Sequence, residues 1–252
     1  MTINSRLRAL SLALLFLGAG PIDAAPSDAY PFHWSTVANN GDFMPTDACD
    51  PTDPQATSPP CRRFNSYNQP SVNANGMVVM RARSRGGQGG EPVHGVYSRD
   101  MAAAGPVVRI LDRGGAVPQP NNTQATFIEP PSFPRIDIRS NTIATRGNHQ
   151  PVWTYQTDGS ETRAGTTGIY TNPFGPLVTG ASKLGGVAEF AFFAVPEQPG
   201  VPFDVFPGAP AVTDATTLVF KGNYTLDGVG KTGVYYRKLT DAPIPADGTE
   251  LS

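Results

Sequence analysis

Charge is scarce in this chain, and neither sign dominates. Charged residues make up 16% of the 252 residues, and the formal net charge is −2 at pH 7. The basic residues form no stripe of the kind that binds a phosphate backbone, and the acidic residues form no tail. We therefore expect no nucleic acid among the partners of this protein.

Reactive and metal-binding side chains are also few. The chain has three histidines and two cysteines, and no two histidines stand at the spacing of metal ligands. The motifs Cys-x-x-Cys, His-Glu-x-x-His and Gly-x-Ser-x-Gly are all missing, which removes the usual signatures of redox centres, zinc proteases and serine hydrolases. The sequence predicts no metal, no cofactor and no catalytic residue.

One segment resembles a nucleotide-binding loop but fails as one. Residues 226–232 end in Gly-Lys-Thr, as a phosphate-binding loop does. Thr225 stands where the first glycine of that loop belongs. The residues that follow favour a strand, whereas the loop needs a helix whose N-terminus faces the phosphates. We expect a hairpin loop here and no nucleotide.

No apolar run is long enough to cross a bilayer, so no stable membrane anchor is expected. Residues 9–17 are apolar, two arginines precede them and small residues follow, which predicts a signal peptide over residues 1–24 with cleavage after Ala24. The protein is thus predicted to be exported to the periplasm or the extracellular space. In that oxidising compartment we expect Cys49 and Cys61 to form a disulfide across a proline-rich loop.

Glycine and proline, by contrast, are abundant, with 27 and 26 residues. Glycine supplies positive φ in tight turns, and proline fixes φ where strands end. The composition therefore predicts an all-β fold of many short strands, without long helices.

A unit recurs three times in the sequence, at residues 70–97, 134–170 and 210–235. Each copy begins with a proline two residues before a β-branched residue, passes through an apolar strand and closes on Gly-Val-Tyr or Gly-Ile-Tyr. A phenylalanine precedes each copy and is expected to be a core anchor. These phenylalanines are Phe64, Phe127 and Phe203.

The third copy lacks the final strand that follows the other two, and the beginning of the chain offers a substitute. Residues 36–45 match residues 109–118 in strand, glycine and proline. We expect a β-propeller-like array of about three antiparallel sheet units, whose N-terminal strand completes the last unit and removes its exposed edge. Three units are few for a propeller, so a shortened relative, an open array and self-association with another copy stay open, as does a β-sandwich.

This interpretation divides the chain into five parts. They are the signal peptide (1–24), an N-terminal strand with the disulfide loop (25–63), repeat 1 (64–126), repeat 2 (127–202) and the incomplete repeat 3 (203–252).

The first copy resembles a known tandem repeat. Asn73, Gly76, Val78 and Met80 follow the spacing Asn-x-x-Gly-x-Val-x-Met. This resembles the repeat of bacterial exported proteins named for the pattern Asn-x-x-Gly-x-Val-x-Phe, with Met80 in place of phenylalanine. The resemblance covers residues 64–236 at most. Within that range the first copy matches the motif, and copies two and three keep only the apolar alternation. It implies export and a propeller-like fold, and it assigns no activity.

Two groups of residues are candidates for binding. A basic residue ends the first long strand of each copy, and around an axis these three would line one mouth and attract an anion, although strand ends also carry such residues for solubility. These residues are Arg81, Arg146 and Lys221. The long loop 148–167 mixes aromatic and polar groups suited to sugars or peptides, or else packs into its own unit. Its candidate residues are His149, Trp153, Tyr155, Asp158, Glu161 and Arg163.

Two classes of function remain. The first is a non-enzymatic binding or structural module for a glycan, peptide or protein partner. The second is a secreted hydrolase with its site at the propeller mouth, and a truncated propeller without independent function is a further alternative. Convergence of His94, His149, Asp158 and Glu161 in one pocket would favour the enzyme, and their scattering would favour binding.

Overall fold

The computed structural model describes residues 33–45, 62–86 and 92–239. The chain divides into two compact units, residues 1–35 and 36–252, and every strand described below belongs to the second. The predicted signal peptide, Cys49 and Cys61 lie outside the described residues. No helix among the described residues is long and apolar enough to span a membrane.

The all-β prediction is confirmed, since the described residues form several antiparallel sheets and two short 3-10 helices. The first sheet has the order β1-β3-β4-β5, with β2 paired to β3. Its strands are β1 (Phe64–Tyr67), β2 (Ser71–Val72), β3 (Met77–Ser84), β4 (His94–Asp100) and β5 (Val107–Asp112).

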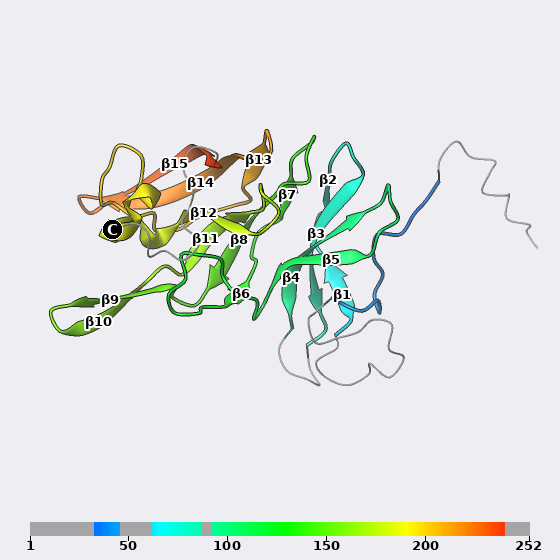
Figure 1. Ribbon diagram of the computed structural model, residues 1–252, viewed down its shortest axis with the longest axis horizontal. Coiled ribbons are helices and arrows are strands. Elements are labelled where there is room, and N and C mark those ends of the chain that lie inside the picture. Colours follow the sequence, from blue (N-terminus) through cyan, green and yellow to red (C-terminus); the bar gives the residue numbers. More distant parts are fainter. Residues whose placement is uncertain (1–32, 46–61, 87–91, 240–252) are drawn as a thin grey trace, which may run out of the picture. The chain divides into compact units, whose positions relative to one another are not determined.

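The second sheet repeats this arrangement, with the order β6-β8-β11-β12 and β7 paired to β8. Its strands are β6 (Phe127–Glu129), β7 (Arg135–Ile136), β8 (Ile143–His149), β11 (Thr167–Thr171) and β12 (Val178–Ser182). A separate hairpin is inserted between β8 and β11, and it projects from the sheet in Figure 1. It consists of β9 (Trp153–Thr157) and β10 (Ser160–Ala164).

The third sheet contains three strands among the described residues, in the order β13-β14-β15. They are β13 (Ala211–Thr213), β14 (Thr217–Leu226) and β15 (Val229–Lys238). Each sheet thus takes its strands from one copy of the sequence repeat. Residues 227 and 228, at the tip of the glycine–lysine–threonine segment, form the turn of the β14–β15 hairpin, with a strand after them.

The same aromatic pair anchors each sheet. The repeat phenylalanine meets the tyrosine of Gly-x-Tyr edge to face, with ring centroids 4.8–5.0 Å apart, in Phe64–Tyr97, Phe127–Tyr170 and Phe203–Tyr235. The glycine two residues before each tyrosine lies under the tyrosine ring. A Cβ added at Gly95 or Gly233 would stand 2.5 or 2.7 Å from the tyrosine Oη. The repeated Gly-x-Tyr is therefore a packing motif.

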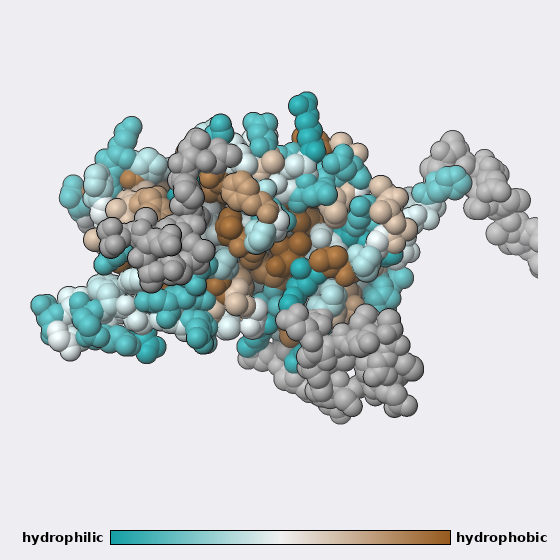
Figure 2. Space-filling model, viewed as in Figure 1, coloured by the Kyte–Doolittle hydropathy of each residue, from teal (hydrophilic) through white to brown (hydrophobic). Residues whose placement is uncertain are grey.

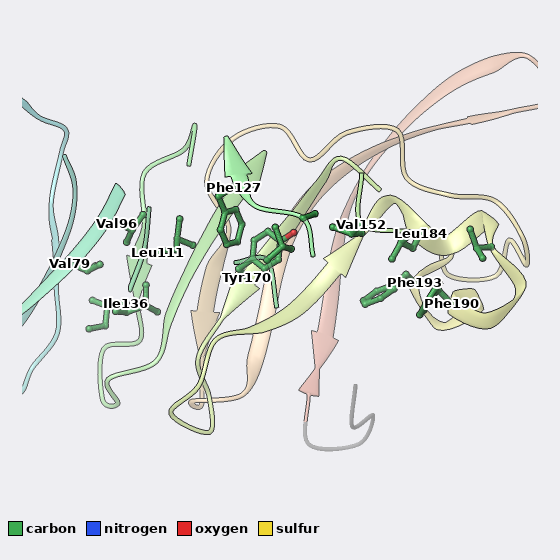
Figure 3. Packing of buried hydrophobic residues seen from close by; sticks show 14 residues of the cluster. Val79, Val96, Leu111, Phe127, Ile136, Val152, Tyr170, Leu184, Phe190 and Phe193 are labelled. Atoms are coloured by element: carbon green, nitrogen blue, oxygen red, sulfur yellow. The ribbon is translucent and has the colours of Figure 1, made fainter. Parts of the chain in front are cut away.

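Apolar side chains between consecutive sheets form the core. Val79, Val96 and Leu111 on one face of the first sheet pack with residues of the second, among them Phe127 and Tyr170 (Figure 3). The opposite side of the second sheet packs against the third in the same way. Its residues Ala144, Ile169 and Ala181 share a cluster with Phe203, Phe206, Val212, Leu218 and Phe220. The sheets therefore stack face to face in the order of the sequence.

The N-terminal segment does not form the strand expected near Val37. Residues 36–40 lie outside any strand, and β15 pairs with β14 alone among the described strands. The segment lies instead against the first sheet, where the backbone oxygens of Thr36 and Val37 accept hydrogen bonds from Arg99 Nη1 at 3.1 and 2.7 Å. No closed barrel or propeller is detected in the described part of the chain.

The match between residues 36–45 and 109–118 nevertheless has a structural counterpart. Gly41 N donates to Phe64 O and Met44 N to Arg62 O, at 3.1 and 2.8 Å. Gly114 N donates to Phe127 O and Val117 N to Ala125 O, at 2.8 and 3.0 Å. Both segments therefore enter the following sheet through the same backbone pairing.

Residues 187–195 are apolar on both faces of an extended chain, a pattern that predicts a buried strand, but no strand forms there. The chain there forms the 3-10 helix η3 (Ala188–Phe193), which follows a shorter 3-10 helix, η2 (Lys183–Gly186). Phe190 and Phe193 are buried in the core between the second sheet and its hairpin, whereas Phe192 is only half-buried. A helical turn satisfies its own backbone groups, so the segment can bury these rings without a neighbouring strand.

Candidate functional site

The three basic candidates occupy equivalent places, and two of them bind the following sheet. Arg81 Nε donates to Pro130 O, and Arg146 Nη1 donates to Phe206 O at 2.5 Å. Pro130 and Phe206 are each the third residue after the repeat phenylalanine of their own copy. Lys221 is exposed. The arginines thus join sheet to sheet through a side chain and a carbonyl group.

We expect Arg146→Met to lower the free energy of unfolding by about 1.5–3 kcal/mol, because a hydrogen bond from a charged donor to a partly buried carbonyl is lost. Urea unfolding at neutral pH measures the change. Lys221→Met is the matched control at the equivalent position and should change stability by less than about 0.5 kcal/mol. Equal effects of the two variants would show that the carbonyl contact contributes nothing.

Loop 148–167 is the β9–β10 hairpin with its flanks, and the structure assigns its residues to different environments. Asp158 and Gly159 form the turn, both with positive φ, as in a type I′ hairpin. Glu161 Oε1 and Arg163 Nη2 form an exposed ion pair at 3.2 Å. Tyr155 is partly exposed. The hairpin is mostly hydrophilic in Figure 2.

Trp153 and His149 belong to the core. The Trp153 ring meets Phe190 edge to face at 4.5 Å. The His149 ring is 3% exposed and lies edge to face with Phe127 and Tyr170. Its Nδ1 is 2.7 Å from Gln150 O, so the neutral ring donates there, while Nε2 is buried without a partner. Burial lowers the pKa of His149 to about 4.

The four residues whose convergence would favour an enzyme do not hydrogen-bond to one another within the described residues. His94 Nδ1 lies 2.9 Å from Arg81 Nη2 in the first sheet. Burial and then the Arg81 charge lower the pKa of His94. Among the described residues, no group of His, Cys, Asp and Glu could hold a metal ion.

A cavity of about 290 Å³ beside β15 has a different character, because aromatic rings surround a guanidinium. Arg237 lies on β15 two residues after the repeat tyrosine, Tyr235, and the alternation of the strand turns both toward the second sheet. Its guanidinium carbon is 5.0 Å from the ring centre of Phe193 and 5.7 Å from that of Phe192. Further lining residues include Ala181, Phe203, Phe220 and Tyr235.

Arg237 has unused hydrogen-bonding capacity in this cavity. Among the described residues, its only hydrogen bond is from Nη1 to Phe192 O at 3.3 Å, whereas a guanidinium has five N–H donors. No carboxylate of the described residues forms an ion pair with it. Burial lowers the pKa of Arg237 to about 10, so the group stays charged at neutral pH. The cavity, which we call the Arg237 pocket, can therefore bind an anion.

A comparison with family models, characterised proteins and solved structures decides nothing further. No match was found in any of the three.

Sequence reasoning missed the Arg237 pocket, although a signal was present. The repeat aligns Tyr235 with two buried tyrosines, and strand alternation then turns Arg237 to the same face. An arginine on a buried face is unusual, because this residue type is mostly exposed. The half of the pocket formed by η3 had no such signal, since its segment was predicted to be a strand.

Proposed function

We propose that the protein is an exported, non-enzymatic binding module, built as a propeller-like array of sheets, that binds a carboxylated glycan in the Arg237 pocket. The repeated face-to-face packing and the repeated arginine-to-carbonyl bonds between sheets support the array. The resemblance of residues 73–80 to an exported tandem repeat agrees with it.

The proposed ligand class follows from the partly buried guanidinium of Arg237, which has unused hydrogen-bond donors and lies among aromatic rings. A carboxylate is the group that best matches the planar fork of a guanidinium, which can donate two parallel hydrogen bonds. Phe192 and Tyr235, both half-buried, line the pocket with apolar ring surface, which suits the C–H side of a sugar ring. The cavity volume of about 290 Å³ is at the lower end of ligand pockets, so one sugar residue fits better than a longer segment.

Titration with glucuronic acid and with glucose, followed by NMR or calorimetry, tests this proposal. We expect glucuronic acid to bind and glucose to bind at least about tenfold more weakly, because only the acid offers a charged partner to Arg237. Arg237→Met keeps the aliphatic stem against the rings and should abolish the difference. Arg163→Met removes an exposed arginine elsewhere and serves as the control.

Equal binding of glucuronic acid to wild type and Arg237→Met would contradict the proposal. Preferential binding of a short peptide through its free C-terminal carboxylate would replace the glycan by a peptide as ligand. The amide-capped form of the same peptide is the comparison that identifies the carboxylate.

A further inference from the structure

Both ends of the array expose apolar residues whose equivalents are buried between its sheets. On the outward face of the third sheet, Val234 is 75% exposed. Its equivalents Val96 and Ile169, which face the next sheet of the chain, are 0% and 1% exposed. Val234 and Tyr236, which is 68% exposed, are the large apolar residues of this face and lie beside Lys221, and no described residue covers them.

The first sheet, at the opposite end of the array, also has an exposed apolar residue whose equivalents are buried. Val72 in the first sheet is 57% exposed, whereas its equivalents Ile136 and Val212 are 8% and 9% exposed because the preceding sheet covers them. Beside Val72 lies an apolar cavity of about 390 Å³. Its lining residues include Val37, Ala38, Val78 and Met80.

Each end of the array also carries one of the two partners of the hydrogen bond that joins consecutive sheets. Arg81 and Arg146 each donate to the carbonyl of the third residue after the next repeat phenylalanine. Lys221 is the equivalent cation in the third sheet and is exposed. The equivalent carbonyl in the first copy belongs to Tyr67, the third residue after Phe64, and this residue is 37% exposed.

The edge strands complete the pattern. In the first two sheets, the strand with Gly-x-Tyr has a neighbour on both sides, but β15 pairs only with β14 among the described strands. Residues 36–39 correspond to residues 109–112 of β5 and enter the following sheet through the same backbone pairing. Val37 and Ala38 pack against the first sheet, as Ile110 and Leu111 pack in the core next to the second. This segment therefore holds the place of the last strand of a preceding sheet.

We propose that a second copy of this chain supplies that preceding sheet. The outward face of its third sheet covers Val72 in the first sheet of its partner, its Lys221 faces the carbonyl of Tyr67, and its β15 pairs with residues 36–39. Because each copy has one end of each kind, two head-to-tail contacts close a ring of six sheets. Six lies within the four to eight blades typical of propellers, whereas a ring of three from one chain does not. The proposal rests on the propeller-like array and is independent of the ligand.

Cysteine cross-linking tests the pairing between copies. In the first sheet Val96 lies opposite Leu111, so by equivalence Val234 should lie opposite Ala38 of the other copy. Cβ atoms at opposite positions are close enough for a disulfide. Mixing Ala38→Cys chains with Val234→Cys chains under mild oxidation should give a two-chain product, and either variant by itself should not.

The chain that carries both Ala38→Cys and Val234→Cys distinguishes a two-chain ring from closure within one chain and from an open array. We expect a two-chain product that no longer grows, because both contacts of a closed ring are linked. A linked single chain would show that residues 36–39 close the array within one molecule, and a ladder of products would show an open array. Either result would overturn the proposal, and so would the absence of any cross-link in the mixture.

Sedimentation of variants at Val234 and Val72 is a second test of self-association. Both residues are exposed in a single chain, so their replacement should leave its fold intact. Val234→Asp and Val72→Asp should each weaken self-association by about 100-fold or more, since an unpaired carboxylate would be buried at the contact. A mixture of the two variants should form two-chain species again, through the one contact that keeps both native surfaces. If the mixture stays as single chains, the contact is not head-to-tail. Val234→Asp should still bind glucuronic acid, because Arg237 lies on the other face of β15.

Discussion

Replacing Tyr170 with alanine is expected to lower the free energy of unfolding by about 3–5 kcal/mol, the usual cost of removing a large aromatic ring from a core. The side chain is 1% exposed and meets both Phe127 and His149 edge to face. It also covers Gly168, so the vacated volume is bounded by a backbone that cannot fill it. Urea unfolding at neutral pH measures the change.

Tyr155→Ala is the matched control for Tyr170→Ala. Tyr155 is on the projecting hairpin and is 38% exposed, so its loss should change stability by less than about 1 kcal/mol. If the two tyrosines proved equally costly, the aromatic pair of the second sheet would not be part of its core. Tyr97→Ala should then behave like Tyr170→Ala, since the first sheet repeats the pair.

Acidification from pH 7 to pH 4 should remove about 3 kcal/mol of stability through His149 alone. Burial lowers its folded-state pKa to about 4, whereas the unfolded value is about 6.5, and one pKa unit corresponds to about 1.4 kcal/mol. The unfolded chain therefore takes up the proton first as the pH falls. Stability is full above about pH 6.5 and declines until about pH 4. The physical reason is that protonated Nε2 would be a buried donor without a partner.

His149→Asn is the variant that tests this assignment, because the asparagine amide can still donate to Gln150 O but does not titrate. It should flatten the stability curve between pH 6.5 and 4, whatever its effect at pH 7. Asp137 acts at lower pH: burial raises the pKa of its carboxyl group, but hydrogen bonds from the backbone of Arg139, Ala215 and Ser140 outweigh this and lower it. An unchanged slope in His149→Asn would assign the acid sensitivity to other groups.

The repeated elements of the fold could be predicted from the sequence because their causes are local. Gly-x-Tyr marks a strand in which the tyrosine ring lies over the glycine. A side chain at the glycine would collide with the ring, so each copy has the same two residues at this spacing. The segment 187–195 could not be predicted in this way. The spacing of its phenylalanines fits the periodicity of a strand as well as that of a helix. Phe190 and Phe193 point inward from a helical turn because they pack against the surrounding sheet and hairpin.

The candidate site was harder to predict because its parts lie on distant segments. The alignment correctly found that Arg81, Arg146 and Lys221 are equivalent, but a single sequence cannot reveal that the acceptor is a carbonyl group of the next sheet. The loop residues were identified by their chemistry, which does not distinguish a binding surface from a turn such as Asp158 or a core contact such as Trp153. Arg237 was missed because its aromatic partners come from η3.

The bonds from Arg81 and Arg146 to carbonyl groups have a consequence for how such a protein can change during evolution. A carbonyl group is present at every residue, so the arginine places no demand on the side chain that follows the repeat phenylalanine. Proline and phenylalanine fill that position equally well here. Gene duplication could therefore add a sheet to the array without any compensating substitution for this hydrogen bond, and only the apolar residues between the sheets would have to match.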